Sequence, residues 1–182
     1  MIYIKDKKKL NKYLFLYRSF IFKFSKFKIL DDDYKDFETA LNKKKRKERL
    51  SFLYYSCCDY VDKYYEGKNL CEFVNNKCLS QQNSKKDLFN GCCRKCRFRT
   101  GGVCPTKNLA CKMFYCSYVK EKHHILGYDD LPLFKIFTPF QRFVLKSDYF
   151  ISSEEAINDL YYGPIICPFL IIYRKIKRCI TK

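Results

Sequence analysis

Residues 67–116 read GKNLCEFVNNKCLSQQNSKKDLFNGCCRKCRFRTGGVCPTKNLACKMFYC, and they hold eight of the twelve cysteines of this 182-residue chain. The same stretch contains only six Leu, Ile or Val residues, whereas residues 123–182 contain seventeen. A segment with so few aliphatic side chains cannot bury an ordinary hydrophobic core, so it needs cross-links to hold a shape. The cysteines therefore decide how the middle of the chain folds.

Metal coordination is the expected cross-link. The Cys93-Arg-Lys-Cys96 spacing follows an Asn90-Gly91 turn, and such a knuckle directs two thiolates to one tetrahedral ion. In a reducing compartment, a cysteine cluster this dense favours metal over disulfides. Zinc leads among the metals, and an iron–sulfur cluster is the alternative because it also takes four thiolates. The predicted ligands are Cys71, Cys78, Cys92, Cys93, Cys96, Cys104, Cys111 and Cys116.

We expect these ligands to form two sites. The first would use Cys71, Cys78, Cys93 and Cys96, and the second Cys92, Cys104, Cys111 and Cys116. Cys57-Cys58 and His123-His124 are spare ligands, although a histidine pair at a helix end is more commonly solvated. Cys167 and Cys179 are interpreted as small buried apolar residues.

One part of this cluster resembles a known family. Gly91-Cys92-Cys93-Arg94-Lys95-Cys96, followed by Cys104 and by LACKMFYC at residues 109–116, is similar to the bacterial cysteine-cluster proteins that chelate zinc or iron. The chain departs from that pattern, since its Cys-Cys doublet precedes the Cys-x2-Cys pair and no Arg-Pro stands before the late cysteine. The resemblance is confined to residues 91–116. It implies metal chelation and leaves the biochemical role open.

The expected fold class is α+β, helix-dominated, with a cysteine-rich, metal-stabilised module in the middle. Three regions follow from composition: a basic N-terminal region with a long helix at 1–66, the cysteine-rich metal-binding module at 67–122, and a helical C-terminal region with a buried apolar segment at 123–182.

In the N-terminal region, the period-two spacing of Tyr13, Phe15 and Tyr17 predicts a strand, as does that of Phe20, Phe22 and Phe24, with a basic amphipathic helix as the alternative. Residues 31–33 are three aspartates that would cap one helix running from about Tyr34 to Tyr64, ended by Gly67.

Turn and cap signals divide the rest of the chain. Residues 71–78 read as a hairpin that turns at Asn75-Asn76, and residues 107–122 as a helix. Thr138-Pro139 should open a helix through Tyr149, and Ser152 with Glu155 a second, short helix that Gly163-Pro164 ends. The uncharged run at residues 160–173 is interpreted as a buried strand.

The formal charge of +18 points to a polyanionic partner. Thiolate ligation at two four-cysteine sites would lower it to roughly +14. On the predicted knuckle, guanidinium groups suit phosphates and an aromatic ring suits a base. The candidate nucleic-acid-binding residues are Arg94, Lys95, Arg97, Phe98 and Arg99. The basic run at residues 43–49 is either a second contact or a solvated helix face.

Catalytic motifs are missing from the sequence. It contains no Walker loop, glycine-rich dinucleotide turn, His-Glu-x-x-His or Gly-x-Ser-x-Gly, and Glu121 precedes His123 where a zinc deaminase needs the reverse order. The sequence therefore favours a small basic zinc protein that binds nucleic acid or a nucleoprotein. An iron–sulfur enzyme and a protein-binding adaptor or inhibitor are the alternatives.

A cytoplasmic location is expected, because Arg18 and Lys23 interrupt the N-terminal apolar stretch and no small-residue cleavage site follows. The run at residues 160–173 would span about 21 Å as a helix, short of the ~30 Å of a bilayer core, so no membrane partner is expected.

Overall fold

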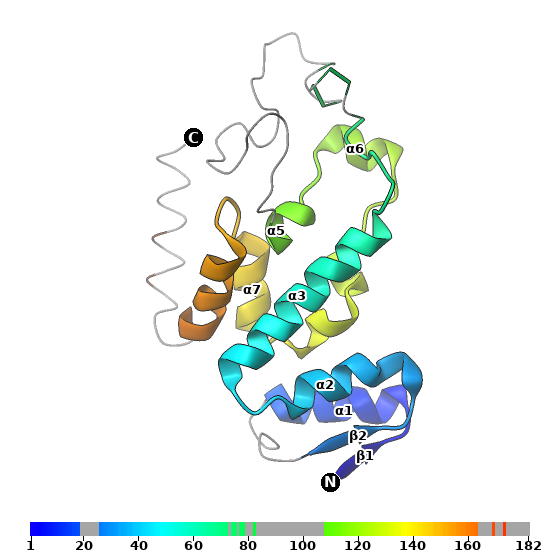
Figure 1. Ribbon diagram of the computed structural model, residues 1–182, viewed down its shortest axis with the longest axis vertical. Helices are drawn as coiled ribbons and strands as arrows, with labels where there is room; N and C mark the ends of the chain where they lie inside the picture. Colours follow the sequence, from blue (N-terminus) through cyan, green and yellow to red (C-terminus); the bar gives the residue numbers. More distant parts are fainter. Residues whose placement is uncertain are drawn as a thin grey trace.

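The computed structural model describes residues 1–18, 26–72, 74–75, 77–78, 82, 108–163, 169 and 173, with residues 15–18 and 33 described by their backbone alone. Helices dominate these residues, as expected for a helix-dominated α+β fold (Figure 1). The elements in chain order are β1 (Ile2–Ile4), α1 (Lys7–Arg18), β2 (Phe27–Ile29), the 3-10 helix η1 (Asp32–Tyr34), α2 (Lys35–Asn42), α3 (Arg46–Tyr64), α5 (Leu109–Lys112), α6 (Ser117–Lys122), the 3-10 helices η3 (Tyr128–Asp130) and η4 (Pro132–Ile136), α7 (Pro139–Ser147), and a helix at residues 153–163.

The chain begins with a parallel β-α-β unit. β1 pairs with β2 in the register Ile2 to Phe27 and Ile4 to Ile29, and α1 makes the crossover. The predicted strand through Tyr13 is wrong and the helical alternative is right. Leu10 and Leu14, four residues apart, are both buried, which a helix achieves on one face. The predicted strand at Phe20, Phe22 and Phe24 lies outside the described residues.

Side chains of α2 close the second edge of β2. The Asn42 carboxamide accepts from the Phe27 N–H and donates to the Phe27 carbonyl, both at 2.8 Å. The Ile29 N–H donates to Glu38 Oε2 at 2.7 Å, and Lys35 Nζ donates to the Ile29 carbonyl at 3.0 Å. This strand edge therefore does not present unpaired backbone groups to another chain.

The single long helix expected from Tyr34 to Tyr64 is two helices. Lys43 and Lys45 adopt extended backbone angles, and the Arg49 guanidinium donates to the Lys43 carbonyl at 3.1 Å. The break lets α2 cover β2 while α3 buries its own apolar stripe, whose spacing is helical. That stripe is Leu50, Leu53, Tyr54, Cys57, Cys58 and Val61. Gly67, with φ of 71°, follows the end of α3 as predicted.

The helix expected at residues 107–122 is also interrupted, and burial explains the break. Met113 packs in the main core, whereas Tyr115 packs in a separate small cluster with Leu70 and Val119. Residues two apart on a helix point to different sides. Ending α5 before Met113 and starting α6 at Ser117 lets both side chains be buried.

The predicted caps in the C-terminal region are confirmed. Thr138 Oγ1 accepts from Gln141 N–H at 3.2 Å, and Gln141 Oε1 accepts from Thr138 N–H at 2.9 Å, although α7 ends at Ser147 rather than Tyr149. The reciprocal Ser152–Glu155 hydrogen bonds, at 2.8 and 3.1 Å, open the helix at residues 153–163.

The buried strand expected at residues 160–173 is wrong wherever the structure describes this run. Residues 160–163 continue the helix, because Ala156, Ile157 and Leu160 are buried at helical spacing. Phe169 and Tyr173 are helical too, and their exposed fractions are 78% and 62%.

One buried core connects the N-terminal unit with the C-terminal region up to Leu160. It includes Ile4 and Leu14 from the N-terminal unit and Phe134 and Leu160 from the C-terminal region. α3 runs between them along the molecule, from the end that holds β1 and β2 toward α6 (Figure 1). Along the described residues, no helix combines the length and apolar character needed to span a bilayer.

Candidate metal centre and basic groove

Four of the eight predicted metal ligands, Cys71, Cys78, Cys111 and Cys116, belong to the described part of the chain. They stand on both sides of residues 79–107, two before and two after. The other predicted site residues lie outside the described residues. These are Cys92, Cys93, Cys96 and Cys104, and the candidate nucleic-acid-binding residues Arg94, Lys95, Arg97, Phe98 and Arg99.

Cys71 and Cys116 pack against the same small cluster. Both are half-buried beside Leu70, Tyr115 and Val119. The chain reaches this point twice because the turn after α3 leads into Cys71, and the segment between α5 and α6 ends at Cys116, the N-cap of α6. The sequence hypothesis placed these two cysteines in different sites, and the structure brings them to one cluster.

The predicted hairpin holds Cys71 and Cys78 on its two arms. Val74 and Lys77 exchange backbone hydrogen bonds of 3.0 and 2.9 Å, and Asn75 takes the positive φ of 49° that the turn requires. Cys78 is buried. The turn at residues 74–77 is therefore confirmed.

Cys111 lies on α5, whose start is fixed by Asn108. The Asn108 side chain is almost fully buried, and its Oδ1 accepts from the Cys111 N–H at 2.9 Å. Its Nδ2 donates to the carbonyls of Asp148 and Ile151 at 2.6 and 2.8 Å. Within the described ranges, no three His, Cys, Asp or Glu side chains converge as a metal site would need.

Cys57 and Cys58, the spare cysteine ligands of the sequence hypothesis, are core residues of α3 with 2% and 5% of their surface exposed. Burial raises the pKa of the Cys57 thiol far above its usual range and raises the pKa of Cys58 to about 12. Metals bind the thiolate. Burial therefore favours the neutral thiol at both positions.

The histidine pair divides into two environments. His123 Nε2 lies 3.5 Å from Glu72 Oε1, at the long limit of a hydrogen bond, whereas His124 is exposed. Lys122 Nζ donates to the Glu72 carboxylate at 3.1 Å, and this contact, more than that of His123, lowers the pKa of Glu72. Lys122 and His123 thus join the end of α6 to Glu72, the residue after Cys71.

A groove of about 630 Å³ lies where α2 gives way to α3. Three lysines and two aromatic rings line it, together with Glu48 and Ser51. Lys43 Nζ lies 5.0 Å from the centroid of the Phe52 ring, and Tyr55 is 45% exposed. The lining lysines are Lys43, Lys45 and Lys47. Cations beside accessible aromatic rings suit a strand of phosphates and bases.

The basic side chains of residues 43–49 have different partners in the structure. Arg46 stacks on Tyr161 at 5.3 Å, and Lys45 pairs with Glu48 at 3.2 Å. Lys44, Lys45 and Lys47 are all exposed. Sequence reasoning missed Phe52 and Tyr55. The signal for Tyr55 was present, because positions 47, 51 and 55 share one face of a helix.

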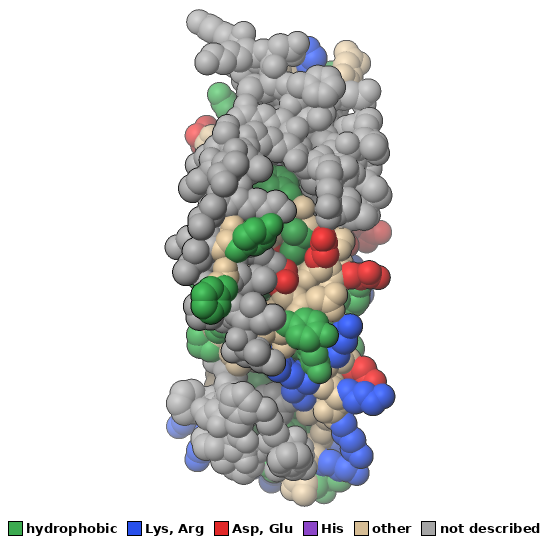
Figure 2. All heavy atoms as spheres, turned by 90° about the vertical axis from the view of Figure 1, so that its left-hand side faces the viewer, with side chains coloured by type: hydrophobic (Ala, Val, Ile, Leu, Met, Phe, Trp, Pro, Cys, Tyr) green, Lys and Arg blue, Asp and Glu red, His purple; other side chains and the backbone are tan. Residues whose placement is uncertain are grey.

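Basic side chains also gather on the neighbouring elements. On the face shown in Figure 2, most Lys and Arg side chains lie toward the end that holds the N-terminal unit. Residues 5–28 carry nine basic residues and one acidic residue. Among the described residues of that face, the groove therefore lies toward the more basic end.

No family model, curated protein or solved structure matches this chain.

Proposed function

We propose that this protein is a zinc-held binding module for nucleic acid. The observation that carries the proposal is the groove at the start of α3, which Lys43, Lys45 and Lys47 line together with the rings of Phe52 and Tyr55. Lysines attract the phosphate backbone, and ring faces stack on bases of any sequence. This combination favours a backbone-tracking surface over a site that reads one sequence.

Zinc would organise the second part of the interface. Cys71 and Cys116 converge on one cluster from the two sides of residues 79–107, which contain four more predicted ligands, Cys92, Cys93, Cys96 and Cys104. This convergence supports a centre that takes ligands from both sides of that stretch. Such a centre would hold Arg94, Arg97 and Arg99 on a rigid knuckle.

Salt dependence of binding tests the proposal. Each phosphate contact contributes about 0.7 to the log–log salt slope on a single strand and about 0.9 on a duplex. Replacing Lys43, Lys45 and Lys47 together by Gln should therefore flatten the slope by about 2 on a single strand. Replacing Arg94, Arg97 and Arg99 by Gln should flatten it by a similar amount. Fluorescence anisotropy of a labelled random-sequence strand measures both.

A third triple variant controls for net charge. Lys63, Lys77 and Lys135 are exposed lysines outside the groove, so changing them to Gln removes the same charge and should leave the slope nearly unchanged. If all three triple variants behave alike, the groove and the knuckle are not the contact surface. Absence of wild-type binding at low salt would exclude nucleic acid and favour the protein-binding alternative.

A further inference from the structure

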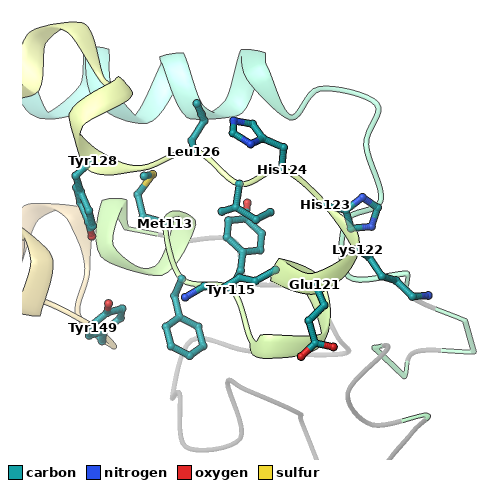
Figure 3. Close-up of a pocket in the computed structure, with 12 residues that line it drawn as sticks. Met113, Tyr115, Glu121, Lys122, His123, His124, Leu126, Tyr128 and Tyr149 are labelled. Carbon is teal, nitrogen blue, oxygen red and sulfur yellow. The ribbon is translucent and has the colours of Figure 1, made fainter.

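A second cavity lies near the far end of α3, between the segment at residues 113–121 and the segment at residues 122–128 (Figure 3). Its volume is about 850 Å³, within the ~300–1,000 Å³ range of small-molecule sites. One end is aromatic and the other carries charge. The aromatic end holds Phe114, Tyr128 and Tyr149, and the charged end holds Lys120, Glu121 and Lys122 beside the two histidines.

The aromatic end presents accessible rings. Phe114 and Tyr149 meet edge to face, with centroids 5.7 Å apart and an interplanar angle of 81°, and Phe114 is 47% exposed. Edge-to-face contact leaves a ring face uncovered. Phe150 continues the row at 6.2 Å from Tyr149 and is 41% exposed.

The loop that carries Tyr149 and Phe150 has a strained backbone. Phe150 has φ of 65°, a backbone conformation that costs an aromatic residue about 1–3 kcal/mol. The two Asn108 hydrogen bonds to the carbonyls of Asp148 and Ile151 clamp the loop on both sides of Tyr149 and Phe150. The molecule thus maintains an unfavourable backbone while it keeps two aromatic rings at the surface.

Tyr128 adds a hydrogen-bonding group inside the cavity. Its ring packs against Phe134, at a centroid distance of 5.0 Å, and the Lys146 ammonium lies 5.2 Å from the Tyr128 centroid and 5.9 Å from that of Phe134. Its hydroxyl is buried and has no hydrogen-bond partner among the described residues. In Figure 3 this hydroxyl points toward that of Tyr149. Burial raises the pKa of Tyr128, so the group is a neutral phenol that can donate or accept.

We propose that this cavity binds one unpaired base of a nucleic-acid strand. The base would stack on Phe114 and Tyr149, its polar edge would hydrogen-bond to the Tyr128 hydroxyl, and its phosphate would lie beside Lys120. This inference rests on the proposed function and deepens it, because it selects single strands over duplexes. In a duplex the base is already paired and stacked, so it cannot enter the cavity.

Two variants test the cavity on the full chain, with a labelled single strand of about 16 nucleotides and a duplex of the same length as probes. Phe114→Ala should weaken single-strand binding roughly 5- to 150-fold, the range for loss of one base–aromatic stack. Tyr128→Phe should weaken it about 3- to 10-fold, as expected for one lost hydrogen bond. Both changes remove no charge, so the salt slope and duplex binding should be unchanged.

Stability separates a binding role of the hydroxyl from a structural one. A buried hydroxyl without a partner is costly, so Tyr128→Phe should leave the urea midpoint unchanged or raise it. Phe143→Ala and Tyr162→Phe are matched controls, because these exposed aromatic residues lie outside the cavity, and they should bind as wild type does. Lower stability with unchanged binding in Tyr128→Phe would overturn the proposal.

The remaining outcomes distinguish the two proposals. If wild type binds strands but Phe114→Ala and Tyr128→Phe bind equally well, the cavity proposal fails and the proposed function stands. If wild type binds no nucleic acid, both fail. Adenosine monophosphate should bind more weakly than the strand because it lacks contacts to the basic groove. Equal affinity for the two would overturn the assignment to a nucleic-acid strand.

Discussion

At the scale of single residues, burial separates the cysteines that the sequence presents together. Cys57 and Cys58 are adjacent to each other on α3 and nearly inaccessible, whereas Cys71 and Cys116 are half-buried at the edge of a small cluster. Desolvation disfavours a thiolate. The first pair is therefore suited to packing, and the second retains access to the partners that a metal site needs.

The raised pKa of Cys58 makes a testable prediction about alkaline stability. The thiol ionises above its usual value of 9.0 in the unfolded chain but only near 12 in the folded protein, so rising pH between these values favours unfolding. At pH 10.5 the loss should be about 2 kcal/mol. The stability advantage of wild type over Cys58→Ala should narrow by that amount between pH 8 and pH 10.5 in urea titrations. A pH-independent difference would contradict this account of Cys58.

At the scale of elements, local signals predicted where helices begin better than where they break. The capping boxes at Thr138 and Ser152 and the stop at Gly67 depend on neighbouring residues, so the sequence was sufficient to place them. The breaks at residues 43–45 and 113–116 depend on which core each helix packs against. That choice involves residues far apart in the chain.

The same limit applies to the candidate sites. Cysteine spacing predicts a metal module, yet the packing of Cys71 and Cys116 against one cluster depends on how the chain returns past α3. The parallel pairing of β1 with β2 was missed because each strand has only three residues. Tyr128, Phe114 and Tyr149 come from three segments, and no local pattern connects them.

Asn108 joins elements that are distant in sequence, and its removal should be expensive. Asn108→Ala removes the cap of α5 and leaves two buried carbonyls without their donor, for an expected cost of about 2–4 kcal/mol. Thr138→Ala removes a cap alone and should cost about 1 kcal/mol. Urea unfolding of both variants measures the difference. Equal costs would show that the clamp on residues 148–151 contributes little.

At the scale of the whole molecule, the chain combines one continuous core with a poorly aliphatic middle. The core extends from Ile4 to Leu160 and explains how the N-terminal and C-terminal regions hold together. Residues 67–116 contribute little to it, with Leu109 and Met113 the described members from that stretch. Structural zinc contributes apparent binding energies of about 10–16 kcal/mol, as much as the stability of an entire domain. Zinc would therefore supply the stabilisation that aliphatic side chains do not provide in this stretch.

The central claim is that zinc holds the cysteine-rich module. Its most direct test is metal analysis, together with a visible spectrum, of the full chain purified aerobically and anaerobically. The account predicts more than one equivalent of zinc per chain, a colourless protein, and no change in electrophoretic mobility on reduction. A brown protein that contains iron would contradict the zinc assignment and support an iron–sulfur enzyme. A metal-free protein whose cysteines between Cys71 and Cys116 are paired as disulfides would contradict the metal-held module itself.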